Sequence, residues 1–233
     1  MPNFKTDVFM LNQKQFIYPY TFENRAPCVF DRVIFIPSYY FEHQIFEMPS
    51  FSSEELFHNT NPVHVEFCSG NGEWIVQKAI ENPDINWIAC EIKFYRVRKI
   101  WVKMKQLNLK NLIIAFGDAN DFAKFYLKDG SIEAIHINFP DPWPKEKHAK
   151  NRLIQELFVK EMKRILKASG DVTIVTDHVD YSHQVLEEME KQFSFSYPSP
   201  HYIHQNIDYG SSYFYRLFES RGKEIRKMQF KVV

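Results

Sequence analysis

The sequence contains few cysteines and no long hydrophobic run, and both features limit the classes of protein to which it can belong. Its three cysteines, Cys28, Cys68 and Cys90, are scattered, with no CxxC pair and no Cys/His grouping. This argues against a disulfide framework or a metal site and predicts reduced thiols in a cytosolic protein. No apolar run approaches the roughly 18 residues that cross a membrane. We therefore expect no metal, no membrane contact and, without a recognisable leader, a cytoplasmic location.

The chain also lacks an excess of either charge, with 29 Lys and Arg against 29 Asp and Glu. This balance excludes a uniformly basic coat for nucleic acid, although it allows a local basic patch. Phenylalanine, in contrast, is abundant, with 22 among 233 residues. We expect a sizeable core packed with aromatic rings.

From about residue 61, short apolar runs alternate with helical periodicity, which is typical of βαβ units and a mostly parallel sheet. The expected strands are Val63–Phe67, Ile85–Cys90, Leu112–Phe116, Ile132–Phe139 and Val172–Thr176, then two late ones near Tyr213–Phe218 and Met228–Val233. The expected helices are a segment ending at Glu81, then Phe94–Leu107, Asn151–Leu166 and Tyr181–Lys191. We predict an α/β, Rossmann-like fold with helices on both faces and an antiparallel addition at the C-terminal edge.

Residues 1–60 have weak periodicity and many aromatic residues, and prolines interrupt them repeatedly. This composition predicts an irregular arm packed on the domain. The expected division is therefore an N-terminal arm, 1–60, and a Rossmann-like domain, 61–233.

Acidic residues stand at the carboxyl ends of the predicted parallel strands. Each of five strands ends in, or just before, an acid: Glu66, Glu91, Asp118, Asp141 and Asp177. Because the carboxyl ends of parallel strands meet at one edge of the sheet, we expect these acids to face one crevice. A single acid there is usually a helix cap or a loop residue. Five like charges indicate a ligand that supplies donors or cations.

The first strand-to-helix turn contains Gly70 and Gly72, but isoleucine stands where a dinucleotide fingerprint has its third glycine. No Gly-Lys-Ser/Thr follows, so phosphate binding has little support. Two glycines beside carboxylates better suit a cationic nucleoside without phosphate, and S-adenosylmethionine fits. We expect Glu66 near its methionine end, Glu91 at both ribose hydroxyls and Asp118 near its adenine amino group.

A rigid turn, Pro-Asp-Pro-Trp-Pro-Lys, follows the fourth expected strand at residues 140–145. Its three prolines leave few competing conformations. The turn presents the Asp141 carboxylate, the Trp143 ring and the Lys145 cation at a strand end. This combination suits a nucleobase, with hydrogen bonds to its edge and stacking on its face. The alternative is a proline-stiffened surface turn.

Two short segments carry much of the positive charge: residues 93–105 have a net charge of +6 and residues 145–152 a net charge of +3. Their cations are Lys93, Arg96, Arg98, Lys99, Lys103 and Lys105, and then Lys145, Lys147, Lys150 and Arg152. A charge run is usually a solvated helix face. Because the second segment adjoins the proline-rich turn, we predict that this side binds RNA phosphates.

With these features together, the sequence resembles the bacterial tRNA (guanine-N7-)-methyltransferase family of class I S-adenosylmethionine-dependent enzymes, over about residues 61–230. The most specific match is Asn138–Lys145, which continues into Lys147-His148-x-Lys150-x-Arg152-Leu153. The other matches are Val65-Glu66-Phe67 with Gly70-x-Gly72, Asn82–Ile88, Gly117-Asp118-Ala119, Val175-Thr176-Asp177 and Phe218-Glu219.

The resemblance implies that a methyl group passes from S-adenosylmethionine to N7 of a guanine in the tRNA variable loop. It implies cofactor contacts at Glu66, Gly70, Glu91, Asp118 and Asp141, and tRNA contacts at Lys145, Asp177 and Glu219. Two residues depart from the family pattern. Cys68 replaces the first turn glycine, so the turn geometry is expected to differ. Arg216 replaces a threonine three residues before Glu219, which changes that contact.

Guanine N7 has a lone pair and no proton, so methylation does not require deprotonation of the attacked atom. We expect catalysis from in-line placement and from electrostatic support of the charge that develops on guanine. Asp141 is the expected catalytic residue: it accepts hydrogen bonds from the guanine edge, and a general-base role is less necessary. Trp143 either stacks on the base or plugs the core beside the turn.

Other functions remain open on the sequence alone. An exocyclic-amine methyltransferase often has an Asn/Asp-Pro-Pro-aromatic turn, whereas here Asp141 separates the prolines. A catalytically idle RNA-binding protein on the same fold draws support only from Cys68 and Arg216. A nicotinamide oxidoreductase is disfavoured by the missing third glycine.

Overall fold

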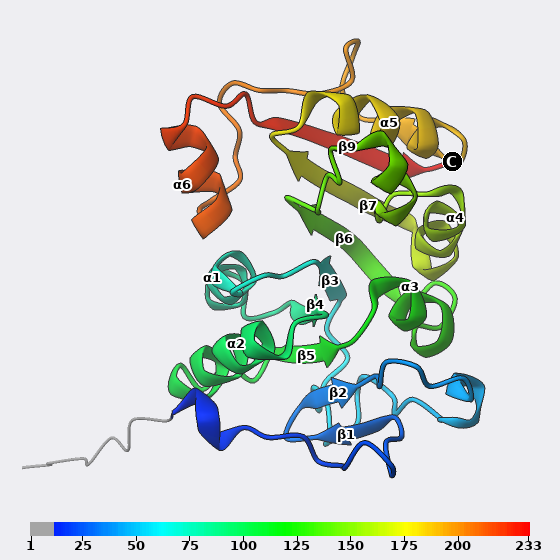
Figure 1. The fold of residues 1–233 in the computed structure, drawn as a ribbon, viewed down its shortest axis with the longest axis vertical. Coiled ribbons are helices and arrows are strands. Elements are labelled where there is room, and N and C mark those ends of the chain that lie inside the picture. The colour runs from blue at the N-terminus through cyan, green and yellow to red at the C-terminus, as the bar shows by residue number, and fades with distance from the viewer. Residues whose placement is uncertain (1–11) are drawn as a thin grey trace, which may run out of the picture.

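Nine strands form one sheet in the computed structural model, which describes residues 12–233 (Figure 1). The strands are β1 (Cys28–Phe30), β2 (Val33–Phe35), β3 (Val63–Phe67), β4 (Asn86–Glu91), β5 (Leu112–Phe116), β6 (Ile132–Asn138), β7 (Leu166–Thr176), β8 (Phe193–Phe195) and β9 (Arg226–Val232). Their order is β1-β2-β5-β4-β3-β6-β7-β9-β8. Strands β2, β5, β4, β3, β6 and β7 are parallel, and β1, β8 and β9 pair antiparallel.

The central strands are buried on both faces, as expected for a sheet with crossover helices. In β5, Ile113 and Ala115 pack into one hydrophobic cluster while Leu112 and Ile114 pack into the other. The first cluster includes residues of η3, α4 and α5, and the second includes residues of α1 and α2. Helices therefore cover both faces (Figure 1).

The helical segments are α1 (Glu73–Glu81), α2 (Phe94–Gln106), α3 (Ala119–Asp121), α4 (Glu156–Ile165), α5 (Val179–Glu190) and α6 (Tyr213–Ser220). Short 3-10 turns are η1 (Gln13–Gln15), η2 (His43–Ile45) and η4 (Glu146–Asn151), and η3 (Phe122–Tyr126) is a π-helical turn. Side chains cap several of them: Asp118 accepts from amides of α3, and Ser212 accepts from the Tyr215 amide of α6 at 3.1 Å.

The predicted fold class is confirmed, including the antiparallel C-terminal addition, which β9 and β8 form. One predicted strand is wrong, because Tyr213–Phe218 belongs to helix α6. Its aromatic residues favour strands, but the Ser212 cap and the packing of Phe214 on Phe218 at helical spacing favour the helix. The helix predicted over Asn151–Leu166 starts later, at Glu156, after η4.

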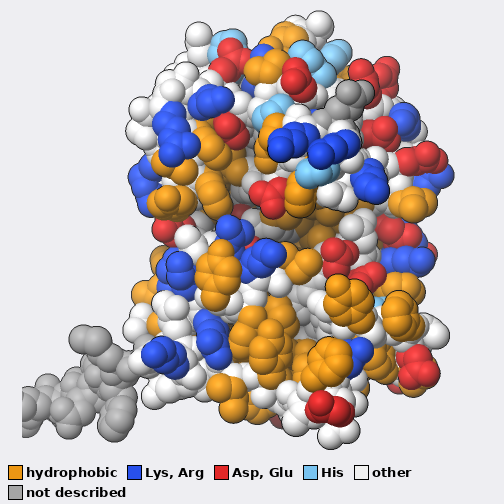
Figure 2. Space-filling model, viewed as in Figure 1, with side chains coloured by type: hydrophobic (Ala, Val, Ile, Leu, Met, Phe, Trp, Pro, Cys, Tyr) orange, Lys and Arg blue, Asp and Glu red, His pale blue; other side chains and the backbone are white. Residues whose placement is uncertain are grey.

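The N-terminal arm is less irregular than the sequence predicts, because β1 and β2 extend the sheet. Strand β2 pairs in parallel with β5, with Val33 opposite Ile114. Phe16 is 2% exposed and stacks on Trp101 of α2, with ring centroids 4.9 Å apart. The arm thus covers part of the face formed by α2. Hydrophobic side chains remain visible on the lower half of the molecule, where β1 and β2 lie (Figure 2).

The strand order reverses in direction at β3 and β6, which lie side by side at the middle of the sheet. Along the chain, β4 and β5 are added on one side of β3, while β6 and β7 are added on the other. In open α/β sheets, ligands bind at the carboxyl edge of this switch point. Helix α6 lies beside this edge, toward which the arrowheads of β6 and β7 point (Figure 1).

Candidate active site

The turn between β3 and α1 adopts a conformation that glycine favours. Cys68, Gly70 and Gly72 all have positive φ, at 65°, 56° and 71°. At Gly72 a side chain is excluded, because a Cβ atom there would lie 2.6 Å from Cγ1 of Ile100. Cys68 adopts the left-handed backbone that a glycine would adopt there. The change from glycine to Cys68 therefore leaves a tight turn in place.

Glu91 ends β4 and lies beside this turn. Its carboxylate is 3% exposed and accepts hydrogen bonds from the Gly70 amide at 2.8 Å and the Lys93 amide at 2.8 Å. Arg96 approaches it at 3.5 Å. Burial raises the pKa of Glu91, and these donors oppose the rise. These hydrogen bonds therefore fix Glu91 against the turn between β3 and α1.

Glu66 lies near the end of β3 and is 2% exposed. Its Oε1 accepts a hydrogen bond from Asn138 Nδ2 of β6 at 2.7 Å, whereas Oε2 has no partner among the described residues. Burial raises the pKa of Glu66 to about 7, against the effect of the Asn138 and Ser69 hydrogen bonds. A buried oxygen without a partner is costly, so this one indicates a position for a ligand donor.

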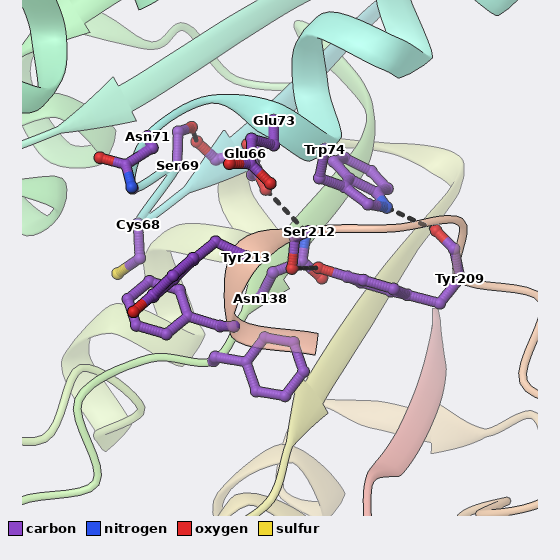
Figure 3. A pocket seen from close by; sticks show the side chains of 13 residues that line it. Glu66, Cys68, Ser69, Asn71, Glu73, Trp74, Asn138, Tyr209, Ser212 and Tyr213 are labelled. Atoms are coloured by element: carbon purple, nitrogen blue, oxygen red, sulfur yellow. Dashed lines mark hydrogen bonds between the residues drawn. The ribbon is translucent and has the colours of Figure 1, made fainter. Parts of the chain in front are cut away.

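A pocket opens beside Glu66 (Figure 3). Three segments line it: the β3–α1 turn, the end of β6 and residues 209–214. The lining residues are Glu66, Cys68, Ser69, Gly70, Asn71, Glu73, Trp74, Asn138, Phe139, Tyr209, Ser212, Tyr213 and Phe214. Trp74 Nε1 donates to the Tyr209 carbonyl at 2.7 Å and joins the first segment to the third.

Residues 209–214 contribute to this pocket, although the acids and the glycine turn do not predict it. Phe214 of α6 covers the glycine turn: a Cβ atom placed on Gly70 would lie 3.5 Å from its ring. The same ring packs near Phe139, with centroids 6.5 Å apart, and the Arg96 guanidinium lies 5.8 Å from its centroid. The only local signal for this helix was the Ser212 cap with Phe214 and Phe218 one turn apart.

Four of the five strand-end acids lie near enough to the Cys68 thiol to affect its pKa. Burial raises the pKa of the Cys68 thiol, and the carboxylates of Glu91, Asp141, Glu66 and Asp118 raise it further. Asp118 caps α3, where its Oδ1 accepts from the Asn120 amide at 2.8 Å. Asp177 follows β7, the strand next to β6, but no described contact joins it to the other four. Of the five acids, Glu66 is the one that lines the pocket, and the common crevice stays a prediction.

The proline-rich turn holds Asp141 exposed between two residues in the left-handed region, Phe139 at φ 49° and Trp143 at φ 41°. The Phe139 amide donates to the Val175 carbonyl at 2.8 Å. Trp143 is 37% exposed and meets the His148 ring edge-on at 5.8 Å. Trp143 is therefore not a core plug, which leaves its ring accessible to a base.

The remaining predicted tRNA contacts, Lys145 and Glu219, are exposed and outside the pocket lining. Lys145 precedes η4, and Glu219 lies on α6. Arg216, three residues before Glu219, forms an ion pair with Glu73 of α1 at 2.7 Å. Its guanidinium is therefore engaged with the protein itself.

The two basic segments differ in what their side chains contact. In α2, Arg98 donates to the Phe16 carbonyl at 2.7 Å, Lys103 donates to the Asn71 carbonyl at 2.8 Å, and Lys105 pairs with Asp31. Around η4, the lysines at positions 145, 147 and 150 are exposed, and no described carboxylate pairs with them. The second segment is thus the one available to a phosphate backbone.

Two features are absent from residues 12–233. No helix there combines the length and the apolar character needed to cross a membrane. No cluster of three or more His, Cys, Asp or Glu side chains in this range is arranged to hold a metal ion.

A family model described as "Putative methyltransferase" matches residues 60–228. The tRNA (guanine-N(7)-)-methyltransferase of Chlamydia trachomatis is 43% identical over 212 residues, which cover 91% of this chain and 94% of the relative. The enzyme of that name from Staphylococcus aureus is 36% identical over 181 residues, covering 76% and 83%.

Solved structures support the fold. The 16S rRNA methyltransferase KamB aligns with a TM-score of 0.58 at 14% identity and covers 80% of this chain and 95% of its own. The aminoglycoside resistance methyltransferase NpmB1 aligns with a TM-score of 0.52, also at 14% identity, over 81% and 95%. At such low identity the likeness concerns the fold alone.

The sheet has the fold of a class I methyltransferase, and the matching family model gives the same class. Within that class, the extent and identity of the sequence matches decide the family. The chain belongs to the tRNA (guanine-N(7)-)-methyltransferase family.

Proposed function

We propose that this protein transfers a methyl group from S-adenosylmethionine to N7 of a guanine in the variable loop of tRNA. The names of its relatives give guanine N7 in tRNA as their target. The single observation that carries the proposal is the buried Glu66 carboxylate, whose unpartnered oxygen lines a pocket at the switch point. The variable loop follows from the resemblance of the proline-rich block.

The residues around the pocket fit this cofactor. Glu66 offers a buried acceptor to a cationic ammonium group, and Glu91 and Asp118 offer carboxylates to hydroxyl and amino groups at neighbouring strand ends. Gly70 lines the pocket without adding a side chain to it. When bound, S-adenosylmethionine supplies an electrophilic methyl group.

Asp141 is the proposed catalytic residue, at the junction of cofactor and substrate. It is exposed on the rigid turn and close enough to affect the Cys68 thiol in the pocket. Its carboxylate accepts hydrogen bonds from the guanine edge and supports the positive charge that methylation places on the ring. No proton has to leave N7, so Asp141 orients and stabilises rather than acting as a base.

The tRNA contacts proposed here are Lys145, Asp177 and Glu219. Lys145 binds phosphate as a point charge, together with the other exposed lysines around η4. Asp177 holds the guanine or the turn that carries Asp141. Glu219 contacts tRNA from α6, without the help of position 216, where Arg216 is paired with Glu73. A tRNA-modifying enzyme with this arrangement works in the cytoplasm, with residues 1–60 as an arm on the catalytic domain 61–233.

The test is to incubate the protein with unmodified tRNA and methyl-labelled S-adenosylmethionine, and then to map the labelled nucleotide. Label on N7 of a variable-loop guanine is expected. Label on an exocyclic amine would keep the class but overturn the substrate. Cofactor binding without any label would show a different acceptor, and absence of both would favour an idle RNA-binding protein.

The Asp141→Ala variant tests the catalytic assignment in the same assay. We expect labelling to fall by on the order of 1,000-fold or more, because the variant loses both the electrostatic support and the orientation of the guanine. Because Asp141 is exposed, the thermal unfolding of the variant should match that of the wild type. Near-normal labelling by a well-folded variant would contradict the role.

A further inference from the structure

The turn that carries Asp141 has a backbone that needs external support. Phe139 and Trp143, on either side of Asp141, both lie in the left-handed region, which non-glycine residues rarely adopt. Such conformations persist only where the surroundings fix them. The prolines restrict φ within the turn, but proline nitrogens donate no hydrogen bonds that would anchor it.

The support comes from Arg152, which lies ten residues beyond the carbonyl that it contacts. Arg152 Nε donates to the Pro142 carbonyl at 2.8 Å. Among the described side chains, Arg152 is the one that hydrogen-bonds to the backbone between Pro140 and Trp143. Since Pro142 directly follows Asp141, this bond fixes the position of the carboxylate.

The guanidinium of Arg152 is itself held from the other side by α5. Its Nη1 donates to Gln184 Oε1, and its Cζ lies 5.2 Å from the ring centroid of Tyr181. Gln184 Nε2 donates to the Ile154 carbonyl at 3.1 Å, and the Tyr181 hydroxyl accepts from the Ile154 amide at 3.2 Å. Tyr181 is fully buried. Arg152 thus connects the turn to a rigid part of the core.

We propose that Arg152 is a positioning residue that holds the Asp141 turn in its reactive geometry through the Pro142 carbonyl. This inference rests on the proposed function, in which Asp141 contacts the guanine. Although Arg152 stands in the basic segment, its side chain faces the protein and is partly buried, whereas Lys150 is exposed. The two residues carry the same charge but have different tasks.

The chemistry distinguishes positioning from phosphate binding. A guanidinium donates in a planar fork to two acceptors and stacks on a ring at once, and an ammonium cannot reproduce this. A phosphate contact, in contrast, requires mainly charge. Arg152→Lys should therefore fail to restore a positioning role but should largely preserve a phosphate contact.

The first experiment compares kcat, KM for tRNA and cofactor affinity in Arg152→Ala and Arg152→Lys. We expect kcat to fall about 10- to 100-fold in both variants, as misplacement of a catalytic group does. Cofactor affinity should stay within about twofold and KM for tRNA within about threefold, since neither depends on this bond. Added guanidinium ion should recover part of the kcat of Arg152→Ala. Gln184→Ala should lower kcat less than Arg152→Ala does. The double variant should have the same kcat as Arg152→Ala, because both residues act through one contact.

Two comparison variants define the alternatives. Lys150→Ala shows the profile of a phosphate contact, a raised KM for tRNA with a weaker dependence on salt. Lys160→Ala removes a charge on α4 that pairs with Glu156, and it should leave all parameters unchanged. A raised KM with normal kcat in Arg152→Ala, restored by Lys, would overturn the proposal in favour of phosphate binding. A joint loss of thermal stability and cofactor affinity would overturn it in favour of a general role in folding.

Hydrogen–deuterium exchange tests the same bond without relying on catalysis. In Arg152→Ala, exchange of the amides in residues 139–145 should increase at least several-fold, with little change in β6 and β7. Unchanged exchange in the turn would overturn the positioning role. If the wild type fails to methylate guanine N7, the proposed function fails, while exchange still decides whether Arg152 holds the turn.

Discussion

Two pairs of polar side chains lie on the same face of the adjacent strands β3 and β6, two residues apart along each strand. Glu66 and Asn138 form the pair at the carboxyl edge, joined by a 2.7 Å hydrogen bond. His64 and His136 form the pair nearer the middle, with ring nitrogens 3.3 Å apart. Because side chains alternate along a strand, both pairs point toward the side of α1.

The two pairs differ in what closes over them. The ring of Trp74 lies 4.9 Å from that of His136, and Trp87 lies 4.9 Å from His64, so aromatic rings enclose the histidines. Above Glu66 there is a pocket, and one oxygen has no described partner. A buried polar pair covered by side chains serves the structure, whereas one that opens to a cavity is available to a ligand.

The same physical cause shifts the two pairs in opposite directions. Burial disfavours the charged form of each group, so it lowers the pKa of His136 to about 3 and raises that of Glu66 to about 7. The neighbouring His64 lowers the pKa of His136 further. His136 and Glu66 are therefore both neutral between about pH 3 and pH 7, but only Glu66 has a role that requires it to ionise.

The largest expected effect is loss of stability in acid through His136. The unfolded chain binds a proton near pH 6.5, whereas folded His136 binds one only near pH 3. The contribution of His136 to the free energy of unfolding should therefore fall as pH drops from about 6.5 toward 3, by on the order of 3 kcal/mol once partial exposure is allowed for. Denaturant unfolding of the wild type and of His136→Gln at a series of pH values checks this. An equal dependence of the free energy of unfolding on pH in the two proteins would contradict it.

The second effect concerns ligand binding by the upper pair. Glu66→Gln keeps an acceptor for Asn138 but removes the negative charge that faces the pocket. We expect the affinity for S-adenosylmethionine at pH 8 to fall by roughly 30-fold, about 2 kcal/mol, as for a lost charge-assisted hydrogen bond. Calorimetric titration measures this affinity. His136→Gln is the matched control, and its affinity should stay within about twofold of that of the wild type. The reverse result would exchange the roles of the two pairs.

The smallest effect is on the stability of Glu66→Gln. Folded Glu66 keeps its proton up to about pH 7, while the unfolded chain loses it near pH 4.5, so the wild type loses stability as pH rises between these values. Glu66→Gln should be more stable than the wild type at pH 8 by about 1 kcal/mol and should gain nothing below pH 4.5. Thermal unfolding at both values measures it. A destabilised variant at pH 8 would show that the charge is compensated in the empty pocket.

These two titrations oppose each other between about pH 4.5 and 6.5 in the wild type. The two contributions therefore partly cancel in that range when both groups are present, and the variants are needed to separate them. His64, whose pKa is also lowered by burial, contributes in the same direction as His136.

Several parts of the site could be predicted because they depend on local order along the chain. The acids Glu66 and Glu91 stand at the ends of recognisable strand patterns, and Gly72 stands in the turn that follows the first of them. Other parts could not be predicted. Strands β1 and β2 are three residues each, and β2 is stabilised by pairing with β5, about 80 residues away. Phe214 reaches the Gly70 turn from the far end of the chain.

The order of residues along the chain is enough to predict the alternation of strands and helices, the acids at the strand ends and the rigid turn around Asp141, because periodicity and backbone restriction act over short distances. Folding determines which of two neighbouring cations, Lys150 or Arg152, faces the protein, and which of the two polar pairs opens to a pocket. Charge and polarity are written in the sequence, but partners, burial and the side chains that cover a group depend on segments that meet only after folding.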